Sequence, residues 1–146
     1  MRTWKYSTTD EYFDFLDFHD ALVEKIQVME NQIVVDIESI NILANHPLNP
    51  HAVAKNTDNC KLIFVNPMSS EATLFLEDKF PKKINCTEFK ELEILKFTQS
   101  EQDDGVMYEI FGSDNDFCLW KVKAKSLVLY WNEFVGDAWF VDWGKE

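Results

Sequence analysis

The chain has 146 residues, a formal net charge of −12, 46% hydrophobic residues and 14% aromatic residues. This length suits one domain with its own core, and the large apolar content is inconsistent with an intrinsically disordered chain. An acidic field repels phosphate backbones and anionic lipid surfaces, which argues against binding to nucleic acid or to a membrane. We therefore expect a single domain spanning residues 1–146.

The cysteines and the start of the chain indicate the compartment. Cys60, Cys86 and Cys118 show no CxxC spacing, so they predict neither a disulfide framework nor a zinc site, and their odd number suggests reduced thiols. The first residues hold no apolar segment of signal-peptide length, and no window approaches the roughly 18 apolar residues of a membrane-spanning helix. We expect a soluble, cytoplasmic protein.

The first 40 residues predict a short helix and then a β-hairpin. Thr8 begins a capping-box spacing, which favours a short helix near residues 9–17. The β-branched run that follows changes phase between Val23 and Ile26, as a β-bulge would require. A two-residue turn at residues 30–31 suits the hairpin, because asparagine tolerates positive φ.

The middle of the chain alternates between strands and breaks. Residues 44–59 contain two prolines and several asparagines, and they predict a long loop. Residues 60–67 are apolar on both faces, which is typical of a central strand, and residues 72–77 predict another strand. Pro81 then marks a break at residues 79–83. Residues 89–97 fit a helix or a strand, and their alternation weakly favours the strand.

The last third predicts a turn and then four strands. Residues 98–105 form a solvated segment that ends in an Asp-Gly reversal signal. Residues 106–112, 116–124 and 126–134 predict strands, with a tight turn between the last two, and residues 136–146 suit an edge strand. The expected fold is mainly β, an antiparallel β-sandwich or open barrel of about eight strands with a short N-terminal helix.

Motifs for catalysis and cofactor binding are missing from the sequence. There is no GxSxG, GxxxxGK[ST], GxGxxG or HExxH pattern. We therefore predict no catalytic residue, no cofactor and no metal ligand. The expected protein is a binding protein and not an enzyme.

Four polar residues nevertheless form a candidate cluster: His19, Asp20, His46 and His51. Neighbouring residues on a strand point to opposite faces, so His19 and Asp20 converge only where the backbone turns. We expect a structural junction, with Asp20 capping a turn and His19 bonded to a carbonyl. The alternative, an acid/base or metal pair, needs help from His46 or His51, whose spacing matches no recurring metal site.

Aromatic and acidic residues alternate near the C-terminus. The candidate binding residues among them are Asp114, Asp116, Trp131, Glu133, Asp137, Trp139, Asp142 and Trp143. Three interpretations fit this pattern. The rings fill the core, or they anchor a protein interface whose carboxylates select a basic partner, or they line a sugar-binding face.

The FHDA sequence at Phe18–Ala21, the hairpin VEKIQVMENQIVVDI and the later CKLIFVN resemble a group of small bacterial proteins of unassigned function. Some members are classed as immunity proteins of polymorphic toxin systems, and KSLVLYW resembles their closing strand more loosely. The resemblance implies an antiparallel sheet and an inhibitor that occludes a toxin without catalysis. An acidic inhibitor would suit a basic toxin, because opposite fields raise the association rate.

Two other functions remain open. One is a small-molecule or carbohydrate-binding domain with a cleft near His19, Asp20, His46 and His51. The other is a homodimer that pairs through the predicted edge at Trp139–Trp143.

Overall fold

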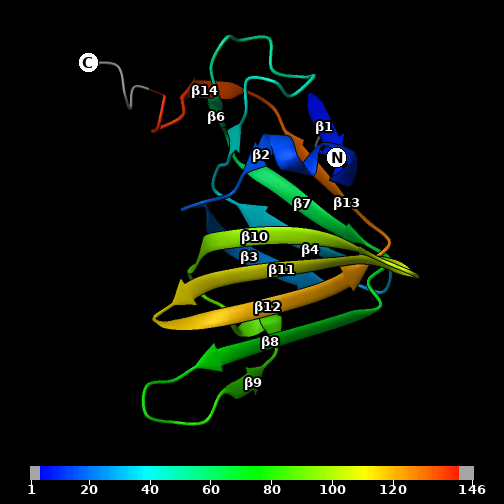
Figure 1. The fold of residues 1–146 in the computed structure, drawn as a ribbon, viewed down its shortest axis with the longest axis vertical. Coiled ribbons are helices and arrows are strands. Elements are labelled where there is room, and N and C mark those ends of the chain that lie inside the picture. Colours follow the sequence, from blue (N-terminus) through cyan, green and yellow to red (C-terminus); the bar gives the residue numbers. More distant parts are fainter. Residues whose placement is uncertain (1–3, 142–146) are drawn as a thin grey trace.

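The structure is a computed structural model that describes residues 4–141. It is mainly β, with antiparallel strands in a ten-stranded and a four-stranded sheet and with short 3-10 helices only (Figure 1). The predicted mainly-β, antiparallel class is confirmed. The large sheet does not close into a barrel, and the strands outnumber the eight that we predicted. Within residues 4–141, no helix has the length and apolar character that crossing a membrane requires.

The strands of the ten-stranded sheet do not follow chain order. Their spatial order is β1 (Tyr6–Thr9), β13 (Ser126–Trp131), β7 (Cys60–Val65), β4 (Gln32–Ile37), β3 (Leu22–Val28), β10 (Leu92–Gln102), β11 (Gly105–Asp114), β12 (Asp116–Ala124), β8 (Ser69–Phe75) and β9 (Lys82–Ile84). The four-stranded sheet runs β14 (Phe134–Asp137), β6 (Lys55–Thr57), β5 (Asn41–Ile42) and β2 (Leu16–Asp17). The 3-10 helices are η1 (Asp10–Phe15) and η2 (Cys86–Glu88).

The large sheet folds over on itself between β3 and β10. These two strands share only two residue pairs, and β10 carries a bulge between Ile94 and Lys96. We call β1, β13, β7, β4 and β3 the rear half, and β10, β11, β12, β8 and β9 the front half (Figure 1). The ring of Phe64 on β7 lies 5.7 Å from Trp120 and 5.1 Å from Tyr108. The inner faces of the two halves therefore share one core.

Alternation along the strands separates an inner from an outer face. On β12, Cys118, Trp120 and Val122 are fully buried and point to the core. Because side chains alternate with a period of two, Phe117 and Leu119 point outward. Each half of the sheet thus contributes an inner face to the core and turns an outer face to solvent.

The N-terminal hairpin follows the sequence prediction. β3 pairs with β4, and the register shifts between Val23 and Lys25, which places the predicted bulge. The backbone N–H of Met29 donates to the carbonyl of Gln32 at 2.8 Å, which closes the turn at residues 30–31. Residues 89–97 contain no helical residue, since η2 ends at Glu88, and β10 begins at Leu92, so the strand alternative is confirmed from Leu92 on.

Several boundaries differ from the prediction. The expected turn at residues 98–105 is strand as far as Gln102, because each residue from Thr98 pairs with β11 despite its polarity. The predicted helix is the shorter 3-10 helix η1, and the long loop already ends at Lys55, where β6 begins. The last described strand is β14, Phe134–Asp137, at the edge of the small sheet, and residues 139–141 form a turn. Of the edge strand predicted at residues 136–146, residues 136–137 are therefore strand, residues 138–141 are not, and residues 142–146 lie outside the described residues.

The tight turn predicted between β12 and β13 does not join two paired strands. β13 pairs with β1 and β7, whereas β12 pairs with β11 and β8. Lys125 between them donates its backbone N–H to the carbonyl of Val65 at 2.9 Å. The chain therefore crosses here from the front half to the rear half.

Candidate functional site

His19 and Asp20 lie together in a surface turn. Asp20 has a φ of 68°, which interrupts the strand alternation, and its carboxylate lies 3.1 Å from Nδ1 of His19. The backbone N–H of Asp20 donates to the carbonyl of Ile94 at 2.7 Å, and the N–H of Ile94 donates to the carbonyl of Ala21. The turn thus ties the segment before β3 to β10. The imidazole contacts a carboxylate and not the backbone carbonyl that we expected.

His46 is buried and tied to other elements. Its Nδ1 accepts the backbone N–H of Leu48 at 3.0 Å, so Nε2 carries the proton and donates to Oγ1 of Thr8 at 2.8 Å. Burial lowers the pKa of His46 and keeps the ring neutral. The residue therefore fastens the loop between β5 and β6 to β1.

His51 has a third set of contacts. Its backbone N–H donates to Oδ1 of Asn49 at 2.8 Å, and its ring lies 5.7 Å from Phe134. Of the four residues in the predicted polar cluster, only His19 and Asp20 contact each other. In the part of the chain that the structure describes, no three His, Cys, Asp or Glu side chains form a group that could hold a metal ion.

The three cysteines are free and buried. Burial raises the pKa of Cys60 to about 12 and that of Cys118 to about 11, and it also raises the pKa of Cys86. A thiol reacts as its thiolate, so these cysteines are poor nucleophiles at neutral pH.

Trp131 is a core residue. Its side chain is fully buried, and its ring stacks on Tyr6 at a centroid distance of 5.3 Å. Leu127 and Leu129 occupy the other inward positions of β13, so strand alternation places Trp131 inside. It cannot contact a partner from there, which corrects its place among the predicted binding residues.

The other predicted binding residues lie in two separate places. Asp114 and Asp116 flank Asn115 at the turn between β11 and β12, and the carboxylate of Asp114 accepts the backbone N–H groups of Lys90 and Glu91. Around β14, at the opposite end of the molecule (Figure 1), lie Glu133, Asp137 and Trp139. Asp137 is paired there with Lys55. Asp142 and Trp143 lie outside the described residues.

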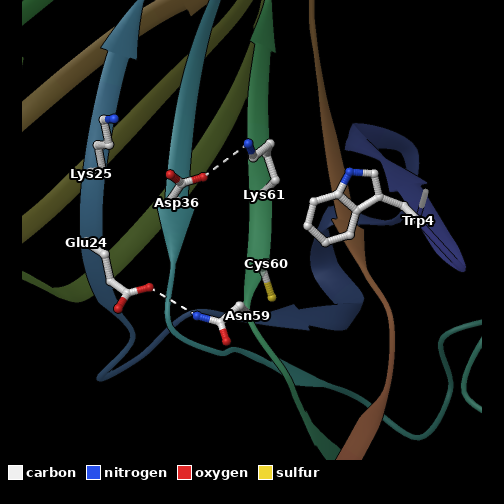
Figure 2. A pocket seen from close by; sticks show the side chains of 7 residues that line it. All are labelled: Trp4, Glu24, Lys25, Asp36, Asn59, Cys60 and Lys61. Carbon is white, nitrogen blue, oxygen red and sulfur yellow. Dashed lines mark hydrogen bonds and ion pairs between the residues drawn. The ribbon is translucent and has the colours of Figure 1, made fainter. Parts of the chain in front are cut away.

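The outer face of the rear half carries paired charges. Lys25, Asp36, Lys61 and Tyr130 stand opposite one another across four strands, and we call this row the charged face. Figure 2 shows the hollow of about 420 Å³ beside it, which is also lined by Trp4, Glu24, Asn59 and Cys60. Nζ of Lys61 lies 3.5 Å from Asp36, and Nδ2 of Asn59 donates to Glu24 at 3.1 Å. Much of the polar lining therefore binds itself.

The outer face of the front half is different in kind. Phe75, Phe111, Phe117 and Leu119 point outward from β8, β11 and β12, and we call them the aromatic face. Phe75 is 40% exposed, Phe111 37% and Phe117 57%. The rings of Phe111 and Phe117 stack with centroids 5.6 Å apart. Clustered exposed rings of this kind mark interaction sites more often than isolated exposed residues do.

A hollow of about 400 Å³ lies at one end of the aromatic face. Its lining consists of Phe75, Glu77, Ser113, Asn115, Asp116 and Phe117, and we call it the acidic hollow. Among residues 4–141, its lining contains two carboxylates and no basic residue. Two lysines elsewhere on this outer face lie beside acids, Lys121 3.6 Å from Glu109 and Lys83 4.0 Å from Glu71. The hollow thus combines aromatic walls with negative charge.

Sequence reasoning missed Phe75, Phe111 and Phe117. The signal that could have found two of them was strand parity, because Tyr108 and Ile110 face the core and therefore place Phe111 outside. The same parity places Phe117 opposite to Trp120. The apolar residues on both faces of these strands concealed the alternation.

Comparison with known proteins assigns no family to this chain. No family model matches it, and neither a curated protein nor a solved structure is similar to it.

Proposed function

We propose that this chain is a non-catalytic binding protein that occupies a basic protein partner, as an immunity-type inhibitor of a basic toxin would. The observation that carries the proposal is the aromatic face, where Phe75, Phe111 and Phe117 expose their rings on neighbouring strands. Large aromatic side chains dominate the binding energy of protein interfaces when a partner removes them from water.

The charge of the molecule favours a basic partner. The net charge is −12, and opposite fields speed the encounter of two proteins. Glu77 and Asp116 place negative charge directly beside the exposed rings. The aromatic face would supply contact area and the carboxylates would supply selectivity.

The two other functions have less support. A cleft built by His19, Asp20, His46 and His51 lacks shared contacts, since only the first two touch. The homodimer was expected to pair through an edge strand at Trp139–Trp143, but residues 139–141 form a turn, and pairing would bring together two molecules of the same negative charge, which costs free energy.

The test uses the purified chain and a basic protein encoded next to its gene, with affinity measured by calorimetry at low and high ionic strength. We expect binding that weakens as salt rises. Phe111→Ser should reduce the affinity by about 2 kcal/mol, about thirtyfold, because it removes one of the exposed rings of the face.

Val135→Ser provides the matched control. Val135 is an exposed apolar residue on β14, at the opposite end of the molecule, and its replacement should change the affinity less than about twofold. Circular dichroism melts verify that both variants fold. Equal affinities of the wild-type chain and Phe111→Ser would refute the proposal.

A further inference from the structure

We infer that the acidic hollow receives the guanidinium group of an arginine from the protein partner. This inference rests on the proposed function and gives the partner's contacting side chain a chemical identity. Three features of the hollow support it: its two ring walls, its unpaired carboxylates and its lack of any basic residue.

The walls of the hollow are two phenylalanines held in register. Phe75 on β8 stands directly opposite Phe117 on β12, and both side chains point outward from the sheet. Ser113 on β11 is the next residue in the same cross-strand row. A cation within about 6 Å of a ring centroid is attracted by the negative face of that ring. The strand pairing therefore fixes the walls before any partner arrives.

The carboxylates of the hollow are available to a ligand. Within residues 4–141, Glu77 and Asp116 have no ion-pair or hydrogen-bond partner, whereas Glu71, Glu109 and Asp104 on the same half of the sheet are each paired with a lysine. Ser113 and Asn115 add a hydroxyl and an amide oxygen that can accept hydrogen bonds. Two unpaired acids thus lie beside the exposed rings.

Arginine fits this set better than lysine does. Its guanidinium is planar, stacks on aromatic rings and donates to carboxylates through a fixed fork, and it is less strongly hydrated than an ammonium group. The hollow of about 400 Å³ has room for this flat group beside the rings of Phe75 and Phe117. Lysine could satisfy the charge but not the stacking.

The experiment is an NMR titration of the whole chain with a short peptide, blocked at both ends, that carries one arginine between glycines and serines. We expect the amide signals of residues 113–117 to shift and saturate. The matched peptide with citrulline, which keeps the shape and loses the charge, should bind about tenfold more weakly, because the charge-assisted hydrogen bonds are lost. A lysine peptide should fall between the two.

Variants locate the binding site. Glu77→Gln should lower the affinity for the arginine peptide about tenfold. Glu30→Gln, which removes the same charge from the exposed turn between β3 and β4, should leave that affinity unchanged. Phe117→Leu keeps an apolar side chain without a ring face and should weaken binding about threefold. Equal binding of the arginine and citrulline peptides, or shifts that avoid residues 113–117, would overturn the inference.

The two proposals fail in different ways. If Phe111→Ser lowers the affinity for the protein partner while the arginine peptide does not bind, the aromatic face is an interface but the hollow is not a guanidinium site. If the peptide binds at the hollow while Phe111→Ser leaves the affinity for the protein partner unchanged, the hollow recognises arginine and the larger interface lies elsewhere.

Discussion

The charged face and the aromatic face are the outer surfaces of two halves of one sheet. They differ in how their outward-facing side chains are paired with neighbours. On the charged face, Asp36 stands between two lysines and lies 3.5 Å from one of them, and Tyr130 packs near Trp4 with ring centroids 5.9 Å apart. On the aromatic face, the ring of Phe117 stacks on another exposed ring, that of Phe111.

This difference shows that outward position alone does not decide whether a residue is solvated. Val34, between Ile63 on β7 and Gln27 on β3, is outward on the rear half but only 5% exposed. Phe117 has the same parity and is 57% exposed, because β8 ends at its partner Phe75. The end of a sheet, where cross-strand neighbours stop, is where apolar surface remains for a partner.

The comparison requires both halves to unfold as one cooperative unit, and Phe64→Ala tests that requirement. Phe64 is fully buried and contacts Tyr108 and Trp120 across the core. Its truncation should lower the free energy of unfolding by about 3–5 kcal/mol, through lost burial and a cavity. Urea unfolding followed by tryptophan fluorescence and by circular dichroism should show one coincident transition. Two separated transitions would mean that the halves unfold independently.

A pair of alanine variants measures how far the two faces differ. Val34→Ala removes a covered side chain, so we expect the unfolding free energy to fall by about 1–2 kcal/mol. Phe117→Ala removes a larger but exposed ring, and its effect should stay within about 0.5 kcal/mol. Both values come from urea denaturation under the same conditions. A larger loss of unfolding free energy for Phe117→Ala than for Val34→Ala would show that Phe117 stabilises the fold, which would contradict its role as an exposed binding residue.

Lowering the pH should destabilise the rear half of the sheet more than the front half. Burial lowers the pKa of His46, so the unfolded chain takes up a proton more readily than the folded one. The stability from the neutral ring is present above pH 6.5, the ordinary pKa of histidine, and is lost as the pH falls from there towards the folded value. The protection factor of the Thr8 amide in β1, which His46 holds, should therefore fall when hydrogen exchange is measured at lower pH, with less change in β12.

His46→Gln is the variant that checks this cause. It should remove most of the pH dependence of the protection factor at Thr8, because glutamine does not titrate. His19→Gln, on the exposed turn, is the matched control and should leave it in place. Parallel loss of protection in both halves with falling pH would contradict the assignment to His46.

Local patterns predicted the elements well where one face is polar or where a turn has its own signal. The bulge near Val23 and the turn at residues 30–31 follow from a phase shift and from an asparagine, both of which act over a few residues. The strand from Thr98 to Gln102 could not be predicted, because its polar residues resemble a turn and only pairing with β11 holds them extended. The candidate site could not be fully predicted for the same reason. Trp131 was predicted to bind a partner, and only its inward position on β13 shows that its side chain is buried.

The sequence by itself determined that this chain is a mainly-β domain with antiparallel strands and an acidic surface, because strand periodicity, turn residues and net charge are local or additive properties. Only the tertiary structure decided which strands pair, and therefore which rings meet. Phe75 and Phe117 lie 42 positions apart in the chain and become neighbours through the β8–β12 ladder. Pairing between distant strands depends on how the whole core closes, so no local pattern could place those two rings around one hollow.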